Sequence, residues 1–231
     1  GALEHACEAA RFTGPTERYA HCVLGDCSEW SGLELSLDQS GSASGATTAS
    51  VTLPSSRVFE DLAPRCAPMG PKGEMWIVVV ESAQGEGAQL AAYALDDTSN
   101  APRLVKVAAT PPIGRQNRWL APVGIADFNG DGQLDVAYVD RPHLARVLRV
   151  VTPRGDLFEE LASRPGHSNH RIGEDFISGG VRECGQGPEM ITADAHWGEV
   201  LSTRLEGSTL VPRSLGPLSG PNSLADALTC P

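Results

Sequence analysis

The chain alternates between short apolar runs and clusters of turn-forming residues. Runs of about five to eight residues that are rich in β-branched and aromatic side chains are typical of strands. Glycine, proline, aspartate or serine borders each run, as tight turns require. No long stretch has the apolar period of an amphipathic helix, and 25 glycines and 17 prolines favour a turn-rich, all-β fold. The predicted strands include residues 77–80, 88–95, 104–109, 122–126, 134–140, 145–151 and 199–205.

The segment from residue 127 to residue 135 has the most specific pattern in the chain. Oxygen-bearing side chains stand at its positions 1, 3, 5 and 9, and glycines stand at positions 4 and 6. Ca²⁺ takes about six to eight oxygen ligands, and glycine supplies the positive φ that a tight coil needs. The alternative is an acidic turn that binds nothing. The pattern predicts a Ca²⁺ site formed by Asp127, Asn129, Asp131, Gln133 (through its carbonyl) and Asp135.

The residues around the loop indicate which kind of calcium loop it is. An EF-hand needs a glutamate at position 12 and a helix behind it, but Tyr138 stands there and residues 134–140 resemble a strand. Residues 122–126 are also extended, so the loop joins two strands. In these features residues 125–140 resemble the FG-GAP repeat of integrin α-chains, called the VCBS repeat in exported bacterial proteins. The resemblance implies a β-propeller in which Ca²⁺ stiffens one loop between strands.

Three degenerate copies of this hairpin can be aligned with it. Residues 66–81 align without gaps on residues 125–140, but the metal ligands are replaced there. Residues 24–37 and 181–194 are weaker copies. A separation of roughly 40 to 60 residues suits a four-stranded propeller blade, and the chain length then gives about four or five blades. The phased repeats favour a compact β-propeller over the rival all-β architecture, a β-sandwich.

The expected organisation is an N-terminal arm, one propeller domain of about four degenerate repeats, and a C-terminal tail. These segments cover residues 1–16, 17–216 and 217–231.

The formal charge is −11 and the chain has only two lysines, so no basic tract exists that could bind a nucleic-acid backbone. No apolar run approaches the length of a membrane span.

The six cysteines indicate an oxidising compartment because their number is even and none forms a Cys-x-x-Cys pair. We therefore expect a periplasmic or secreted protein whose signal peptide has been removed. Cys230 is predicted to bridge to Cys184 and so tie the tail to the last repeat. Cys7 is expected to pin the N-terminal arm, with three possible partners left open: Cys22, Cys27 and Cys66.

An arginine precedes the inner strand of each copy, a position that lies at one mouth of the channel in a propeller. The hypothesis is that these arginines and two histidines converge on an anionic ligand or on a partner's carboxylates, which guanidinium groups bind bidentately. The alternative is that each arginine pairs with a local acid such as Glu17, Glu60, Asp61 or Glu174. The candidate residues are Arg18, His21, Arg57, Arg118, His170 and Arg171.

A second histidine pattern is a further candidate for a metal site. His167 and His170 have the spacing of a zinc or copper pair, but two ordinary loop histidines explain it as well. No motif of nucleophilic catalysis is present, and no catalytic residue is predicted.

We expect a calcium-binding interaction module that binds a protein partner or a glycan and belongs to a larger assembly. The alternatives are a hydrolase or lyase acting on anionic sugars or phosphate esters at the channel mouth, and a calcium-dependent lectin.

Overall fold

The computed structural model describes Cys7 and residues 9–37, 48–98 and 101–230. Within this part the chain forms seventeen strands and one four-residue helix, which confirms the all-β class. The residues group into two compact units. The N-terminal unit contains residues 6–118 and 155–157, and the C-terminal unit contains residues 119–154 and 158–231. Each unit is described by itself below.

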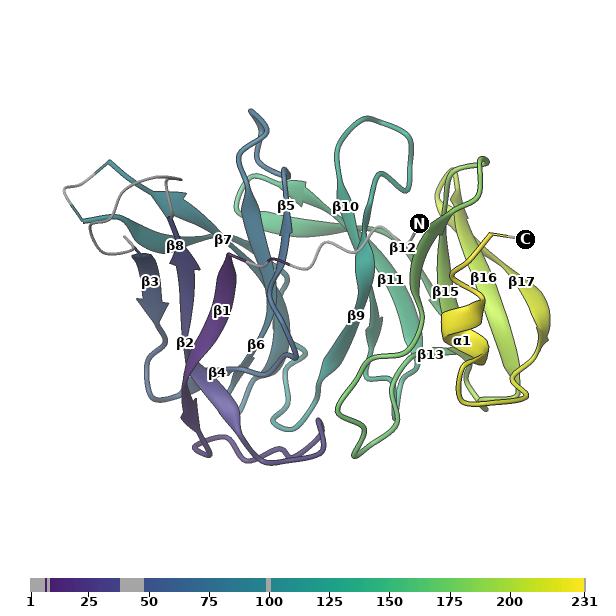
Figure 1. The fold of residues 1–231 in the computed structure, drawn as a ribbon, viewed down its shortest axis with the longest axis horizontal. Helices are drawn as coiled ribbons and strands as arrows, with labels where there is room; N and C mark the ends of the chain where they lie inside the picture. The colour runs from purple at the N-terminus through teal and green to yellow at the C-terminus, as the bar shows by residue number, and fades with distance from the viewer. Residues whose placement is uncertain (1–6, 8, 38–47, 99–100, 231) are drawn as a thin grey trace. The chain divides into compact units, whose positions relative to one another are not determined.

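The N-terminal unit is a closed β-barrel. Six strands are hydrogen-bonded in ring order, since β3 (Thr48–Thr52) pairs with both β2 (Glu29–Ser36) and β8 (Arg103–Ala109) and leaves no open edge (Figure 1). A further strand, β1 (Ala10–Thr16), pairs with β2, and β5 (Arg65–Ala67) pairs with β6 (Trp76–Ala83). In order, the ring strands are β2 (Glu29–Ser36), β4 (Arg57–Phe59), β6 (Trp76–Ala83), β7 (Gly87–Asp96), β8 (Arg103–Ala109) and β3 (Thr48–Thr52).

Apolar side chains from every strand of the ring form the core of this unit. Leu33, Phe59, Ile77 and Tyr93 are among its buried members. Strand β6 is buried along its whole length, so its apolar run does not alternate with exposed residues. Burial of these side chains from water is the main force that holds the ring together.

The C-terminal unit contains two sheets, each with four strands that follow one another along the chain (Figure 1). The first sheet contains β9 (Leu120–Ala126), β10 (Asp135–Asp140), β11 (Val147–Arg154) and all but the first residue of β12 (Leu157–Pro165). The second sheet contains β14 (Gly180–Glu183), β15 (Pro188–Asp194), β16 (Glu199–Glu206) and β17 (Thr209–Pro217), with the short β13 (His167–Ser168) beside β15. Helix α1 (Ser223–Asp226) buries Leu224 against the second sheet.

The hairpins of the two units share one register. Cys66 lies opposite Ile77 in the β5–β6 pair, and Ile125 lies opposite Val136 in the β9–β10 pair. These are the residues that the gapless alignment places on one another. Two more adjacent strands follow each hairpin, β7 and β8 in one unit and β11 and β12 in the other. The described strands thus repeat a local pattern, but they do not show a ring of blades, because those of the N-terminal unit close into a barrel.

Three disulfides cross-link the chain. The predicted bridge Cys184–Cys230 is present and fixes the residues after α1 to the end of β14. The sequence left the partner of Cys7 open, and the structure pairs it with Cys66, which anchors the residues before β1. The remaining disulfide, Cys22–Cys27, closes a small loop. In the described residues, no helix is long and apolar enough to cross a membrane.

Candidate calcium site

The predicted calcium loop connects β9 to β10, as expected from the extended residues on both sides. Gly130 and Gly132 have φ values of +76° and +86°, so both adopt the left-handed conformation that the sequence predicted. A Cβ atom on either residue would meet no heavy atom within 4 Å. The requirement for glycine here is therefore conformational and does not come from crowding.

The side chains of the loop wrap around its backbone. Asp127 accepts hydrogen bonds from the N–H groups of Gly130 (2.7 Å), Asp131 (3.1 Å) and Gly132 (2.8 Å). Asp131 accepts the N–H of Gln133 at 2.8 Å, and this hydrogen bond is the main reason why the pKa of Asp131 is lowered. The same carboxylate accepts Nδ2 of Asn129 at 3.0 Å. The predicted ligands thus lie on one compact coil.

Asp135, the last predicted ligand, is fully buried at the start of β10. Its Oδ2 accepts the N–H of Phe128 at 3.0 Å, whereas its Oδ1 has no hydrogen-bond partner. Burial raises the pKa of Asp135 to about 6, the charges of Asp131 and Asp127 add to the rise, and the Thr152 hydroxyl and the Phe128 N–H oppose it. Thr152 lies close enough to affect this pKa, but its Oγ1 forms no hydrogen bond of acceptable geometry. One buried carboxylate oxygen is left uncompensated.

The donor set of the loop suits a hard cation, because carboxylate and amide oxygens are the ligands that Ca²⁺ takes. The uncompensated Oδ1 of Asp135 fits this interpretation, since a buried charge needs a counter-charge or a hydrogen bond. In the described part of the chain, however, no three His, Cys, Asp or Glu side chains are grouped as they would be around an ion. The carboxylates of Asp127 and Asp131 point at backbone N–H groups instead. The side-chain amide of Gln133 points to the Pro153 carbonyl, 3.5 Å away.

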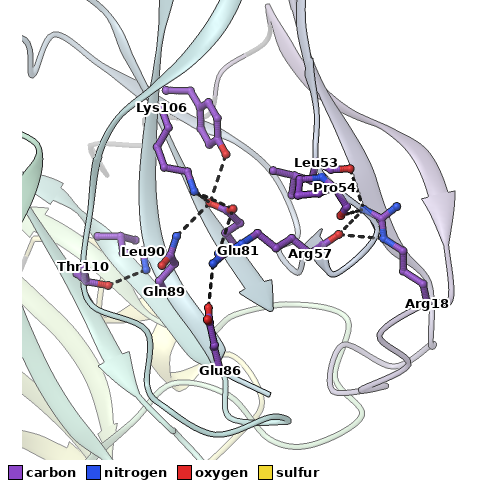
Figure 2. A network of polar contacts seen from close by, with 11 residues as sticks. Arg18, Leu53, Pro54, Arg57, Glu81, Glu86, Gln89, Leu90, Lys106 and Thr110 are labelled. Atoms are coloured by element: carbon purple, nitrogen blue, oxygen red, sulfur yellow. Dashed lines mark hydrogen bonds and ion pairs between the residues drawn. The ribbon is translucent and has the colours of Figure 1, made fainter. Parts of the chain in front are cut away.

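Two candidate arginines of the N-terminal unit, Arg18 and Arg57, have local partners (Figure 2). Arg18 donates to the carbonyls of Leu53 (3.3 Å), Pro54 (3.1 Å) and Arg57 (2.9 Å), so it fastens the turn between β3 and β4. Arg57 pairs with Glu86 at 2.8 Å and with Glu81 at 3.5 Å. Neither of these acids is among those that the sequence suggested as partners.

The remaining candidates are also engaged. His21 Nδ1 lies 2.5 Å from Glu60, and Arg118 donates to the Asn117 carbonyl at 2.8 Å. In the C-terminal unit, the Arg171 guanidinium lies 4.1 Å from the centre of the Trp197 ring. The six candidates are divided between two units: Arg18, His21, Arg57 and Arg118 in the N-terminal unit, and His170 and Arg171 in the C-terminal one. Their convergence on one ligand stays a prediction.

The spacing of His167 and His170 does not bring the two imidazoles to one point. His167 Nδ1 lies 2.9 Å from the Thr192 hydroxyl, and burial lowers its pKa to about 4. His170 contacts His143 and the Glu174 carbonyl instead. Both side chains are buried, and His167 lies in the short strand β13.

Sequence analysis did not identify the polar cluster inside the barrel around Glu81 (Figure 2). Glu81 is fully buried and pairs with Lys106 Nζ at 2.6 Å and with Arg57. It also accepts hydrogen bonds from Gln89 and from the Tyr93 hydroxyl, both at 3.3 Å. Burial, with Glu81 adding to it, raises the pKa of Tyr93 far above its usual range. The available signal was a glutamate directly after the apolar run 77–80, together with one of only two lysines in the chain.

No protein-family model matches this chain, and no curated protein sequence matches it significantly.

Proposed function

We propose that this chain is an extracytoplasmic, calcium-binding β-repeat module in which Ca²⁺ has a structural role. The observation that carries the proposal is the buried carboxylate of Asp135, whose Oδ1 has no partner and which lies near the negative charges of Asp127 and Asp131. A divalent cation bound to all three carboxylates would offset two of their three negative charges. The ligands would be the side chains of Asp127, Asn129, Asp131 and Asp135 and the carbonyl of Gln133.

The bound ion would supply positive charge and would fix the loop between β9 and β10. Asp127 and Asp131 already order the loop through backbone hydrogen bonds, and on binding their oxygens would turn from these N–H groups to the ion. Because the ion binds the folded state in preference to the unfolded one, it stabilises the protein by mass action. Sites of this kind in extracellular modules bind with Kd values of about 10⁻⁴–10⁻³ M.

The repeat pattern and the disulfides support the wider proposal. The shared register of the β5–β6 and β9–β10 hairpins supports FG-GAP-type repeats at the level of the single hairpin. Three disulfides agree with an oxidising, extracytoplasmic location. In this proposal the loops of the module bind a protein partner or a glycan, and the ion keeps one of those loops in its binding conformation.

Calorimetric titration of the intact protein with Ca²⁺, and thermal melts with Ca²⁺ or with chelator, test the proposal. At a Ca²⁺ concentration of 100 Kd the ion should stabilise the fold by about 2.7 kcal/mol. The variant Asp131→Ala should lose the heat of binding and the effect of the chelator. Asp175→Asn removes one exposed acid elsewhere in the same unit and should keep both. An identical melting temperature of the unmodified protein with and without chelator would refute a bound ion.

A further inference from the structure

Two histidines that lie 27 residues apart in the chain meet in the C-terminal unit. His143 Nε2 lies 2.9 Å from His170 Nδ1. His143 stands in the turn between β10 and β11 and is half-buried, whereas His170 follows β13 and is fully buried. One nitrogen of each ring thus faces the other across a hydrogen bond, so the two imidazoles lie within reach of a single metal ion.

The hydrogen bonds of His170 determine where its lone pair lies. Its Nε2 is 2.9 Å from the Glu174 carbonyl, which can only accept, so Nε2 carries the proton and Nδ1 carries the lone pair. Burial lowers the pKa of His170, which keeps that lone pair free of a proton at neutral pH. Metal-ligating histidines usually donate the other ring N–H to a carbonyl or carboxylate, because this contact fixes the tautomer and the orientation of the ring.

The backbone around both histidines is held in place. Ser168 Oγ donates to the Pro142 carbonyl at 3.0 Å, next to His143. The N–H groups of Gly166 and His167 donate to the Arg146 carbonyl at 2.9 and 3.0 Å, at the other end of the same turn. The turn that carries His143 is therefore fastened to the segment that carries His170 from both sides.

We propose that Cu(II) or Ni(II) binds between His143 Nε2 and His170 Nδ1, with water completing the coordination shell. Among divalent first-row metals Cu(II) has the highest affinity for nitrogen sites, and imidazole suits both Cu(II) and Ni(II), whose tetragonal shells leave positions for water. The 2.9 Å between the two nitrogens is the length of the hydrogen bond in the metal-free pair, and it shows that both rings are within reach of one ion.

Binding requires one adjustment in the pair. In the metal-free state His143 donates its Nε2 proton to His170, so that proton has to move to Nδ1 of the same ring when the ion enters. The half-buried His143 ring then turns so that the two lone pairs converge on the ion, while His170 stays fixed by Glu174. In the described part of the chain no third His, Cys, Asp or Glu is grouped with the pair, and in this proposal water molecules supply the remaining ligands.

Trp119 provides a built-in reporter for the site. Its ring centre lies 6.4 Å from that of His143 and 4.9 Å from that of His170. A paramagnetic ion bound between the two imidazoles should therefore quench the fluorescence of this tryptophan. The variant Trp119→Phe should lose that part of the quenching and keep the binding.

The test is a titration of the intact protein with CuSO₄ in excess Ca²⁺, followed by tryptophan fluorescence and by electron paramagnetic resonance. Ca²⁺ keeps the acidic loop from taking up the copper. We expect one saturable site whose spectrum shows two equatorial nitrogen ligands. In His143→Gln the amide can still donate to His170, so the fold should be retained, but the affinity should fall at least about tenfold and one nitrogen coupling should vanish.

His196→Gln is the matched control, because His196 is exposed in the β15–β16 hairpin and belongs to the same unit. It should leave both the affinity and the two nitrogen couplings unchanged. Two results would overturn the proposal. One is the absence of a saturable copper site in the unmodified protein, and the other is an affinity that His143→Gln leaves unaltered while circular dichroism shows an intact fold.

Discussion

The backbone N–H of Phe128 donates to Oδ2 of Asp135 across the neck of the loop between β9 and β10, at 3.0 Å. This hydrogen bond compensates one oxygen of a fully buried carboxylate and leaves Oδ1 without a partner. A folded protein tolerates such a group when a bound cation or another part of the site stabilises it. Neutralising Asp135 should therefore stabilise the metal-free protein rather than destabilise it.

Asp135→Asn should stabilise the metal-free protein and abolish its response to calcium. The amide retains the acceptor for Phe128, carries no charge and can donate to the nearby Thr152 hydroxyl. A pKa of about 6 in place of the ordinary value of 3.8 corresponds to a cost of about 3 kcal/mol for the charged form at pH 7. We expect a gain of up to about that size in chelator, measured by urea unfolding.

Asp140→Asn is the control at the other end of β10. Asp140 is also buried, but Arg141 and Arg149 both pair with it, so neutralising it should destabilise the fold. Opposite signs for the two substitutions are the expected result. A loss of stability in Asp135→Asn with chelator present would show that its carboxylate is well compensated without any ion.

Loss of Lys106 from the Glu81 cluster should destabilise the protein more than neutralisation of Glu81 itself. Lys106→Met leaves a fully buried glutamate with Arg57 as its remaining cation, and we expect a loss of about 2–4 kcal/mol. Glu81→Gln leaves cations that are partly exposed to water, and Arg57 keeps Glu86, so the loss should be smaller. Urea unfolding of both variants and of the double variant measures the coupling. Equal and additive losses would contradict a buried, shared ion pair.

Local features were predictable from the sequence because they depend on neighbouring residues. The positive φ of Gly130 and Gly132 follows from the Asp/Gly spacing, and the strands on both sides follow from β-branched runs. The Cys184–Cys230 bridge was predictable because Cys230 lies outside the strand-like runs of the sequence. The register shared by two hairpins was visible as a gapless alignment.

The closure of the N-terminal strands into a barrel was not predictable from these local signals. Whether successive hairpins form separate blades or a barrel depends on β3, which bonds to both β2 and β8. The parallel contact between Ser50 and Arg103 joins segments that lie far apart in the sequence, and no local pattern encodes it. The pairs Glu81–Lys106 and His143–His170 depend on such closure too, which explains why sequence analysis did not identify them.

Removing the Cys184–Cys230 bridge should cost more stability than removing Cys22–Cys27. The bridges close loops with sequence separations of 46 and 5 residues. Loop-closure entropy then gives upper values of about 4 and about 2 kcal/mol. Urea unfolding of the two double Cys→Ser variants compares them. An equal effect of both pairs would indicate that chain entropy does not govern the contribution of the tail bridge.

His167 should make the protein sensitive to mild acid. Its pKa is about 4 in the folded state, against an ordinary value of 6.5 for the unfolded chain, because burial disfavours the charged ring and Arg164 adds to the effect. The unfolded chain therefore binds a proton more readily below pH 6.5. The contribution of the neutral ring is fully present above pH 6.5 and is lost as the pH falls toward 4, a change of about 3 kcal/mol.

His167→Asn removes this titration and keeps a polar group near the Thr192 hydroxyl. The variant loses packing at every pH, so the informative quantity is the difference in unfolding free energy between variant and unmodified protein. That difference should shift in favour of the variant as the pH falls from 6.5 to 4, because only the unmodified protein has to keep an imidazole neutral. If His167→Asn gives a constant difference across this range, the buried imidazole takes up its proton in the folded state as readily as in the unfolded one.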